Sequence, residues 1–174
     1  VTAGLLATSA SASSPDQIAG CNVLPRGTFT NPTTIDNPNL PLTPGTRFTL
    51  EGRVSANGTP LPHTVVFTVT DVTKVINGVR TVVVLDQDLD TGELLEEELS
   101  FWAQDDNGTV WNLGEYPEEY EAGVFVGAPL AWIDGVAGAI GGVHMLADPT
   151  TGTYFYVQGS SPTIDFLDCA RYNA

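Results

Sequence analysis

Positive charge is scarce in this 174-residue chain, which has 6 Lys plus Arg against 21 Asp plus Glu and a formal net charge of −15. Nucleic-acid binding depends on clustered Lys and Arg that neutralise phosphates. The composition therefore excludes a nucleic-acid-binding protein, and it disfavours docking on anionic lipid. No apolar run approaches the roughly 18 residues that a membrane-spanning helix needs, so we expect no membrane span.

Residues typical of catalytic centres are also few. His63 and His144 are the only histidines, and the nucleophile signature G-x-S-x-G does not occur. Two histidines without suitably spaced partners do not predict a zinc site, and His144 lies in an apolar run typical of a core. Acids are so numerous that no carboxylate pair stands out as a glycosidase pair. We therefore predict no catalytic residues and no enzyme.

Only two cysteines occur, Cys21 and Cys169, near opposite ends of the chain. In a secreted protein such a pair predicts one disulfide; the alternative is two separate buried thiols. The N-terminal VTAGLLATSASASS resembles the tail of a secretory signal, although we expect it to belong to the mature chain. We predict an extracellular or cell-surface protein with an extension over residues 1–20 and a single β domain over residues 21–174, closed by the disulfide.

From residue 46 the sequence alternates with a period of two, which is typical of β-strands. Asn57-Gly58, Asn77-Gly78, Asp90-Thr91-Gly92 and the 105–108 segment separate the alternating runs, and Asn-Gly is a strong hairpin signal. We predict an all-β protein with an antiparallel meander of about six strands over residues 46–114. The meander would form a β-sandwich or barrel with an extended N-terminal arm. EYPEEYE, residues 115–121, is interpreted as an acidic helical turn or loop, and short strands follow it.

The strand faces are assigned from the same alternation. TVVVL, residues 81–85, is apolar on both faces and is therefore expected at the centre of the sheet. In ELLEEELSF we expect Leu95, Leu99 and Phe101 to point inward and Glu96, Glu98 and Ser100 to point outward. The acids would then form a solubilising coat that discourages pairing at sheet edges.

Asp86, Asp88, Asp90 and Glu97 have the spacing of positions 1, 3, 5 and 12 of an EF-hand loop. They are the one candidate Ca²⁺ site, and no other cofactor is predicted. Thr91 stands where that loop needs Gly, and the flanking sequence is β rather than helical. The alternative is a hairpin whose solvent-exposed face carries these aspartates.

Two N-x-T sequons, at Asn57 and Asn107, lie at predicted hairpin tips. Pro60 directly follows the first sequon and disfavours its glycosylation, so Asn107 is the better candidate for a covalently attached glycan. Thr8, Ser9, Ser11 and Ser13, followed by Pro15, have the composition of O-glycosylated segments. The alternative for the two sequons is ordinary turn chemistry, and the alternative for the Thr- and Ser-rich segment is a flexible linker.

Residues 46–115 and their flanks carry a wider pattern. LPLTPGTRFTLEG, VTDVTKVINGVRTVVVLDQD and TGELLEEELSFWAQDDNGTVWNLGE resemble a family of uncharacterised secreted bacterial β-rich proteins. The resemblance covers about 70 residues well, extends loosely over 130–155, and implies no activity and no catalytic residues. The chain also resembles, more weakly, the subunits of glycan-decorated extracellular fibrils.

Two functions follow from these observations. In the first, the chain is a filament subunit whose arm adds a strand to a neighbouring copy, with Val1, Ala3, Leu5 and Ala7 facing inward. Its partners are copies of itself, and the alternative is an arm that folds back on its own domain. In the second, the chain is a monomeric secreted module that binds carbohydrate or another ligand, for which Trp102, Trp111 and Trp132 could offer stacking surfaces.

Overall fold

The computed structural model describes residues 17–56, 58–149 and 155–172, and these residues form twelve β-strands and no helix. The prediction of an all-β protein is confirmed. The strands are β1 (Gln17–Ile18), β2 (Cys21–Asn22), β3 (Arg47–Ala56), β4 (Thr59–Ile76), β5 (Val79–Asp90), β6 (Glu93–Gln104), β7 (Val110–Glu121), β8 (Val124–Gly127), β9 (Trp132–Ile133), β10 (Ile140–Met145), β11 (Phe155–Ser161) and β12 (Phe166–Ala170).

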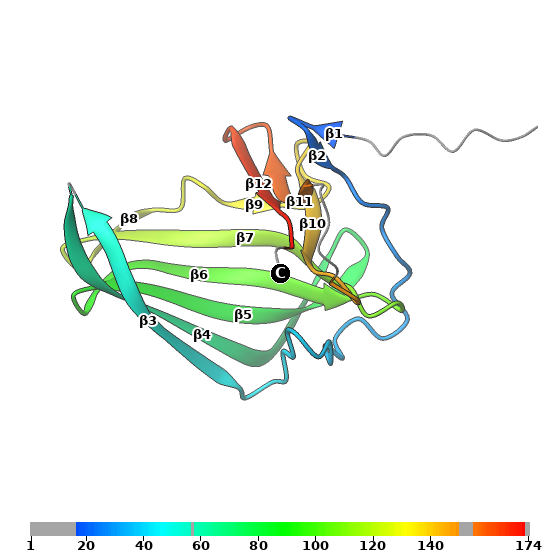
Figure 1. Cartoon of the computed structure of the whole chain (residues 1–174), viewed down its shortest axis with the longest axis horizontal. Helices are drawn as coiled ribbons and strands as arrows, with labels where there is room; N and C mark the ends of the chain where they lie inside the picture. Colours follow the sequence, from blue (N-terminus) through cyan, green and yellow to red (C-terminus); the bar gives the residue numbers. More distant parts are fainter. Residues whose placement is uncertain (1–16, 57, 150–154, 173–174) are drawn as a thin grey trace, which may run out of the picture.

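The strands form one sheet in the order β1-β2-β11-β10-β7-β6-β5-β4-β3, with β12 on β11 and with β8 and β9 on β7. All pairs are antiparallel except β2 with β11. The sheet does not close, so the architecture is sandwich-like rather than a barrel. β3 forms one edge, and β1 lies at the opposite end of the strand order (Figure 1).

Strands β3 to β7 are the predicted meander, with five long strands instead of about six. Asn77 and Gly78 have φ values of 43° and 82°, and Thr91 and Gly92 have 52° and 86°. Positive φ at both central residues is what a two-residue type I′ hairpin requires. The interpretation of residues 115–121 as a helical turn or loop is wrong: they continue β7, because β6 and β8 pair along that part of the strand.

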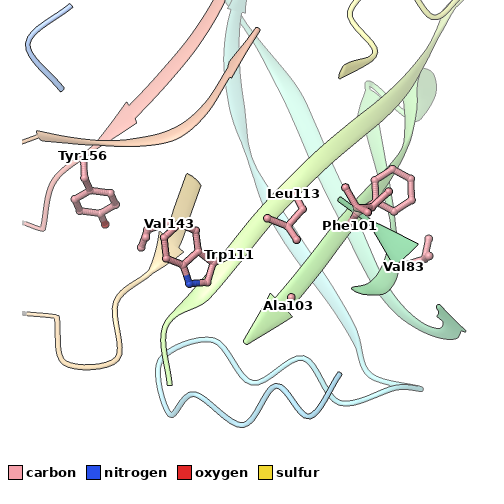
Figure 2. Close-up of a cluster of buried hydrophobic side chains, with 8 residues drawn as sticks. Val83, Phe101, Ala103, Trp111, Leu113, Val143 and Tyr156 are labelled. Carbon is pink, nitrogen blue, oxygen red and sulfur yellow. The ribbon is translucent and has the colours of Figure 1, made fainter. Parts of the chain in front are cut away.

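One core cluster lies on the face of the long sheet that carries Trp111, which we call the Trp111 face. Val143 of β10 and Tyr156 of β11 pack with Trp111 and Leu113 there (Figure 2). β10 connects β11 to the long sheet: Ile140 and Gly141 pair with β11, and Gly142, Val143 and Met145 pair with β7. A Cβ atom on Gly142 would lie 2.2 Å from a backbone oxygen of β11, so this close approach requires glycine.

A second cluster lies on the opposite face, which carries Val82, Val84 and Trp102 and which we call the Trp102 face. Ile35 and Leu42 from the proline-rich segment 23–46 cover one end of this face. Both faces of the segment 81–85 are therefore buried, as its composition predicts.

Polar contacts fix the proline-rich segment over this cluster. Asn37, only 2% exposed, donates hydrogen bonds to the backbone oxygens of Gly108 and Leu146. Asp106 accepts hydrogen bonds from Thr28 and Thr30. Segment 23–46 therefore packs against one end of the Trp102 face, and the other end of this face stays open.

The predicted disulfide between Cys21 and Cys169 is present, with Cα atoms 6.3 Å apart. Cys21 lies in β2 and Cys169 in β12, and both strands pair with β11. The bridge thus joins β2, near the start of the described chain, to the last strand, β12, across one shared neighbour.

Candidate functional site

The open end of the Trp102 face carries a concentration of carboxylates. The strand register places Asp86 opposite Glu98 and Asp88 opposite Glu96 on β5 and β6, and it places Glu115 of β7 opposite Ser100. Side chains of such directly opposed pairs share a face and lie close together. We call Asp86, Asp88, Glu96, Glu98 and Glu115 the acidic cluster.

These carboxylates are partly withdrawn from water, which changes their protonation. Burial, reinforced by Glu115 and the other neighbouring acids, raises the pKa of Glu98 to about 9. Burial and Asp88 raise the pKa of Asp86 to about 6. Burial also raises the pKa values of Glu96 and Glu115. Glu98 is therefore protonated at neutral pH, because a charged carboxylate there is poorly solvated and faces like charges.

Glu115 is held in a defined position by two donors. Trp132 Nε1 donates to Glu115 Oε2 at 2.9 Å, and the Asn112 side-chain amide donates to Oε1. Gly114 allows this arrangement, because a Cβ atom at its φ of 147° would lie 2.8 Å from the Trp132 backbone oxygen. The close approach of β9 to β7 therefore sets the position of this carboxylate.

Asp86 carries a buried oxygen atom that the described residues leave without a hydrogen bond. Its Oδ1 atom is buried and has no hydrogen-bond partner within the part of the chain that the structure describes. Among the described residues, ion pairs join Arg26 to Asp134 and His63 to Asp88 and Asp90. No Lys or Arg described by the structure thus neutralises Asp86 or Glu98.

Aromatic rings continue the Trp102 face beside the acidic cluster. Phe67 of β4 lies directly opposite Asp86, and its ring contacts those of Phe48 and Trp102 at centroid distances of 6.3 and 5.8 Å. His144 packs edge-on against Trp102 at 4.4 Å, and burial lowers its pKa to about 4, so it is neutral. Phe48, Phe67, Trp102 and His144 line a cavity of about 350 Å³, which we call the aromatic pocket.

A second cavity, of about 500 Å³, lies on the far side of the acidic cluster. Its acidic wall includes Asp88, Asp90, Glu96 and Glu119, and His63 Nδ1 contacts Asp90 Oδ1 at 2.7 Å. The strand register places the Asp86–Glu98 pair between the residues that line the two cavities, although neither residue lines either of them. We refer to this open end of the Trp102 face, aromatic on one side and acidic on the other, as the groove.

The residues of the predicted Ca²⁺ site are not brought together. Asp86 and Asp88 lie on the Trp102 face, whereas Glu97 lies on the Trp111 face and accepts a hydrogen bond from Gln87 at 2.7 Å. Among residues 17–56, 58–149 and 155–172, no group of three or more His, Cys, Asp or Glu has an arrangement that could hold a metal ion.

The other predicted sites divide into those that the structure describes and those that it does not. Asn107 is exposed in the turn between β6 and β7, where its backbone N–H donates to Asp105 Oδ1. Trp102, Trp111 and Trp132 are only 3–4% exposed, so none of them offers a free stacking surface. Outside the described residues lie the arm positions Val1, Ala3, Leu5 and Ala7 and the glycosylation candidates Asn57, Thr8, Ser9, Ser11 and Ser13.

The face assignment of β6 is confirmed for Phe101, which is 4% exposed, but it is wrong for Leu95, Leu99 and Ser100, and this error concealed the site. Leu95 and Leu99 are 38% and 39% exposed, whereas Ser100 is 1% exposed and Glu98 is half-buried. Glu96 and Glu98 are therefore partly buried on the Trp102 face instead of belonging to a solvated coat. One signal for the site was present: a two-residue hairpin loop at Thr91-Gly92 aligns the Asp86–Asp88 and Glu96–Glu98 segments on opposing strands.

The fold and this groove define an open, sandwich-like all-β protein with an acidic and aromatic face. No protein-family model, curated protein or solved structure matches the chain. Within the described ranges there is also no helix of the length and apolarity needed to cross a membrane.

Proposed function

We propose that this protein is a secreted structural subunit that assembles head to tail into filaments. In this assembly, residues 1–16 of one copy add a strand to the free edge of β3 in the next copy. The observation that carries the proposal is the long open edge of β3. All ten residues of β3 pair with β4 on one side without a bulge, and no described strand pairs on the other side.

Such an edge is unusual in a protein that remains alone. Natural edges are commonly blunted by short strands, charged side chains, bulges or proline. β3 carries Arg47, Glu51 and Arg53, but it is long and continuous and has no proline. Arg47 and Arg53 give β3 two of the chain's six basic residues. A strand joining at this edge therefore meets less negative charge than it would elsewhere on this acidic protein.

The opposite end of the strand order supplies the donor. The described chain begins at β1, away from β3 in the sheet order, and residues 1–14 carry no charged side chain. Sixteen extended residues span about 53 Å at roughly 3.3 Å each, more than the roughly 33 Å of a ten-residue strand. Donor and acceptor on different surfaces make a heterologous contact, which propagates unless rotation closes it.

A matched pair of substitutions tests strand donation. Leu5→Asp places a charge on the face predicted to point inward, and Leu6→Asp places the same charge on the other face. Negative-stain microscopy and light scattering should show filaments for the unmodified chain and the Leu6→Asp variant, and monomers for Leu5→Asp. Filaments that persist after deletion of residues 1–16 would refute donation, and so would an unmodified chain that stays monomeric at high concentration.

A complementation experiment identifies the acceptor. A synthetic peptide of residues 1–16 should bind the deletion variant in a one-to-one complex, and a scrambled peptide should not. Binding should protect the amides of β3 from hydrogen exchange, because the added strand would pair with its free edge. Protection confined to β12 or β8 would contradict β3 as the acceptor.

Extracellular placement and glycosylation belong to the same proposal. The disulfide is compatible with an oxidising compartment. Asn107 is exposed at the tip of its turn, where an attached glycan would meet no described strand edge. Mass spectrometry of protein purified from its natural source should find the glycan on the peptide that contains Asn107, and an unmodified peptide would reject this assignment.

A further inference from the structure

We propose that the groove on the Trp102 face binds a small organic cation, an ammonium group attached to an apolar body. The ammonium would lie at Asp86 and Glu98, and the apolar body would occupy the aromatic pocket. This binding activity is separate from strand donation, because the groove lies on a sheet face and strand donation uses the outer edge of β3.

The aromatic pocket fits the apolar part of such a ligand. Its volume of about 350 Å³ lies at the lower end of the range of small-molecule sites. Leu40 and Leu50 complete the walls beside Phe48, Phe67 and Trp102. Leu50 is 59% exposed, so a ligand on this side would cover apolar surface that now faces water.

The acidic cluster supplies the charge that complements the cation. Phe67 and Asp86 are direct cross-strand partners, so their Cβ atoms lie about 5 Å apart. Glu98 is the next side chain along the same row. An ammonium at this point would lie between carboxylates and the aromatic rings, two groups that both attract cations.

The buried Oδ1 atom of Asp86 independently indicates a missing donor. It lacks a hydrogen-bond partner within the described ranges, and Asp86 has no ion-pair partner there. An ammonium carries up to three N–H donors and a positive charge, so it would satisfy this acceptor and Glu98 together.

Alternative occupants fit less well. A Ca²⁺ ion takes six to eight oxygen ligands, and the acids here do not converge in such a set. A sugar would stack on an exposed aromatic face, and Trp102 of the aromatic pocket is only 4% exposed. A plain anion is excluded by the surrounding negative charge.

Cation binding should displace protons from the groove. The titratable groups that face it are His63 of β4, Asp86, Asp88 and Asp90 of β5, Glu96 and Glu98 of β6, Glu115, Glu119, Tyr120 and Glu121 of β7, His144 of β10 and Asp168 of β12. Because burial raises the pKa of Glu98 to about 9 and holds a proton on it, a bound ammonium beside Glu98 and Asp86 would stabilise the ionised form of Glu98. Calorimetry in two buffers of different ionisation enthalpy should therefore detect proton release near pH 7.

The test uses phenethylammonium as the probe and 2-phenylethanol as its uncharged counterpart. Calorimetry with the full chain should show saturable binding of the cation and at least about tenfold weaker binding of the alcohol, the effect of one charge-assisted hydrogen bond. Butylammonium, which lacks the ring, should bind more weakly than phenethylammonium because it fills less of the aromatic pocket.

Substitutions locate the site. Asp86→Asn should weaken binding of phenethylammonium by about tenfold, and Phe67→Leu should weaken it without altering proton release. Glu97→Gln is the matched control: it neutralises the neighbour of Glu98 on the opposite face and should leave affinity unchanged. Circular dichroism should verify the fold of each variant before titration.

Three results would overturn the proposal. They are equal affinity for the cation and the alcohol, an Asp86→Asn variant that is folded and binds as well as the unmodified chain, and no binding of phenethylammonium at millimolar concentration. None of these results bears on filament assembly, which the arm substitutions test separately.

Discussion

Replacing Glu98 by glutamine tests whether the acidic cluster governs the pH dependence of stability. The pKa of Glu98 is raised from 4.5 to about 9 in the folded protein, first by burial and then by neighbouring acids. The folded state therefore holds a proton that the unfolded chain releases above about pH 4.5. The stability from this group is complete below the unfolded pKa and is lost as the pH rises through the folded pKa.

The size of the effect follows from one excess proton. Each pH unit between the two pKa values lowers the free energy of unfolding by about 1.36 kcal/mol. Raising the pH from 5 to 8 thus removes at most about 4 kcal/mol, and we expect about 2–4 kcal/mol because water in the groove screens the charge. Glutamine has nearly the same shape and no charge at any pH, so the variant should avoid this loss.

Urea unfolding followed by tryptophan fluorescence at pH 5, 6, 7 and 8 measures the difference. The Glu98→Gln variant should match the unmodified chain at pH 5 and exceed its stability by about 2–4 kcal/mol at pH 8. Glu97→Gln, on the opposite face, should give a curve parallel to that of the unmodified chain. Parallel curves for Glu98→Gln and the unmodified chain would refute the reasoning, because Glu98 would then be ionised in both folded and unfolded states.

Further predictions concern the packing and cross-links of the fold. Asp134, 6% exposed, accepts hydrogen bonds from the side chains of Arg26 and Asn77 and from the backbone N–H of Gly141. Asp134→Ala should therefore lower the free energy of unfolding in urea by about 3 kcal/mol. A loss below about 1 kcal/mol would show that these hydrogen bonds contribute little to stability. Gly142→Ala should lower the melting temperature, with a loss of about 2 kcal/mol in the free energy of unfolding. Gly52→Ala is the control: nothing lies within 4 Å of its added Cβ atom, so the free energy of unfolding should change by no more than about 0.5 kcal/mol. Equal effects at the two glycines would be inconsistent with the packing described. Replacing Cys21 and Cys169 by serine removes a cross-link between residues 148 positions apart. If chain entropy dominates, the free energy of unfolding measured in urea should fall by about 5 kcal/mol. Unchanged stability would mean that the bridge does not restrict the unfolded chain.

Local signals determined much of the strand framework. Asn77-Gly78 and Thr91-Gly92 can adopt positive φ, and such residues set two-residue hairpins and hence the register of β4, β5 and β6. The apolar segment 81–85 predicted a central strand for the same reason that it is buried on both faces. These features depend on residues a few positions apart, so the sequence alone is sufficient to predict them.

Residues 115–121 show where local reasoning fails. Their charge and proline favour a loop or a helical turn, yet they form strand because β6 and β8 provide backbone partners. Pro117 is tolerated in the strand although it offers no N–H to the ladder. This choice depends on distant partners that no short window of sequence contains.

By itself, the sequence determined the all-β class, the hairpins and the disulfide. Which face of β6 is covered was decided only by the tertiary structure. Segment 23–46 covers one end of the Trp102 face, and β10 and β11 cover one end of the Trp111 face. Period-two alternation separates the two faces of a strand but does not say which is covered, so Leu99 is left exposed while Glu98 joins the groove. The acidic cluster and its raised pKa values arise from that packing, because burial and the convergence of charges from different strands exist only in the folded chain.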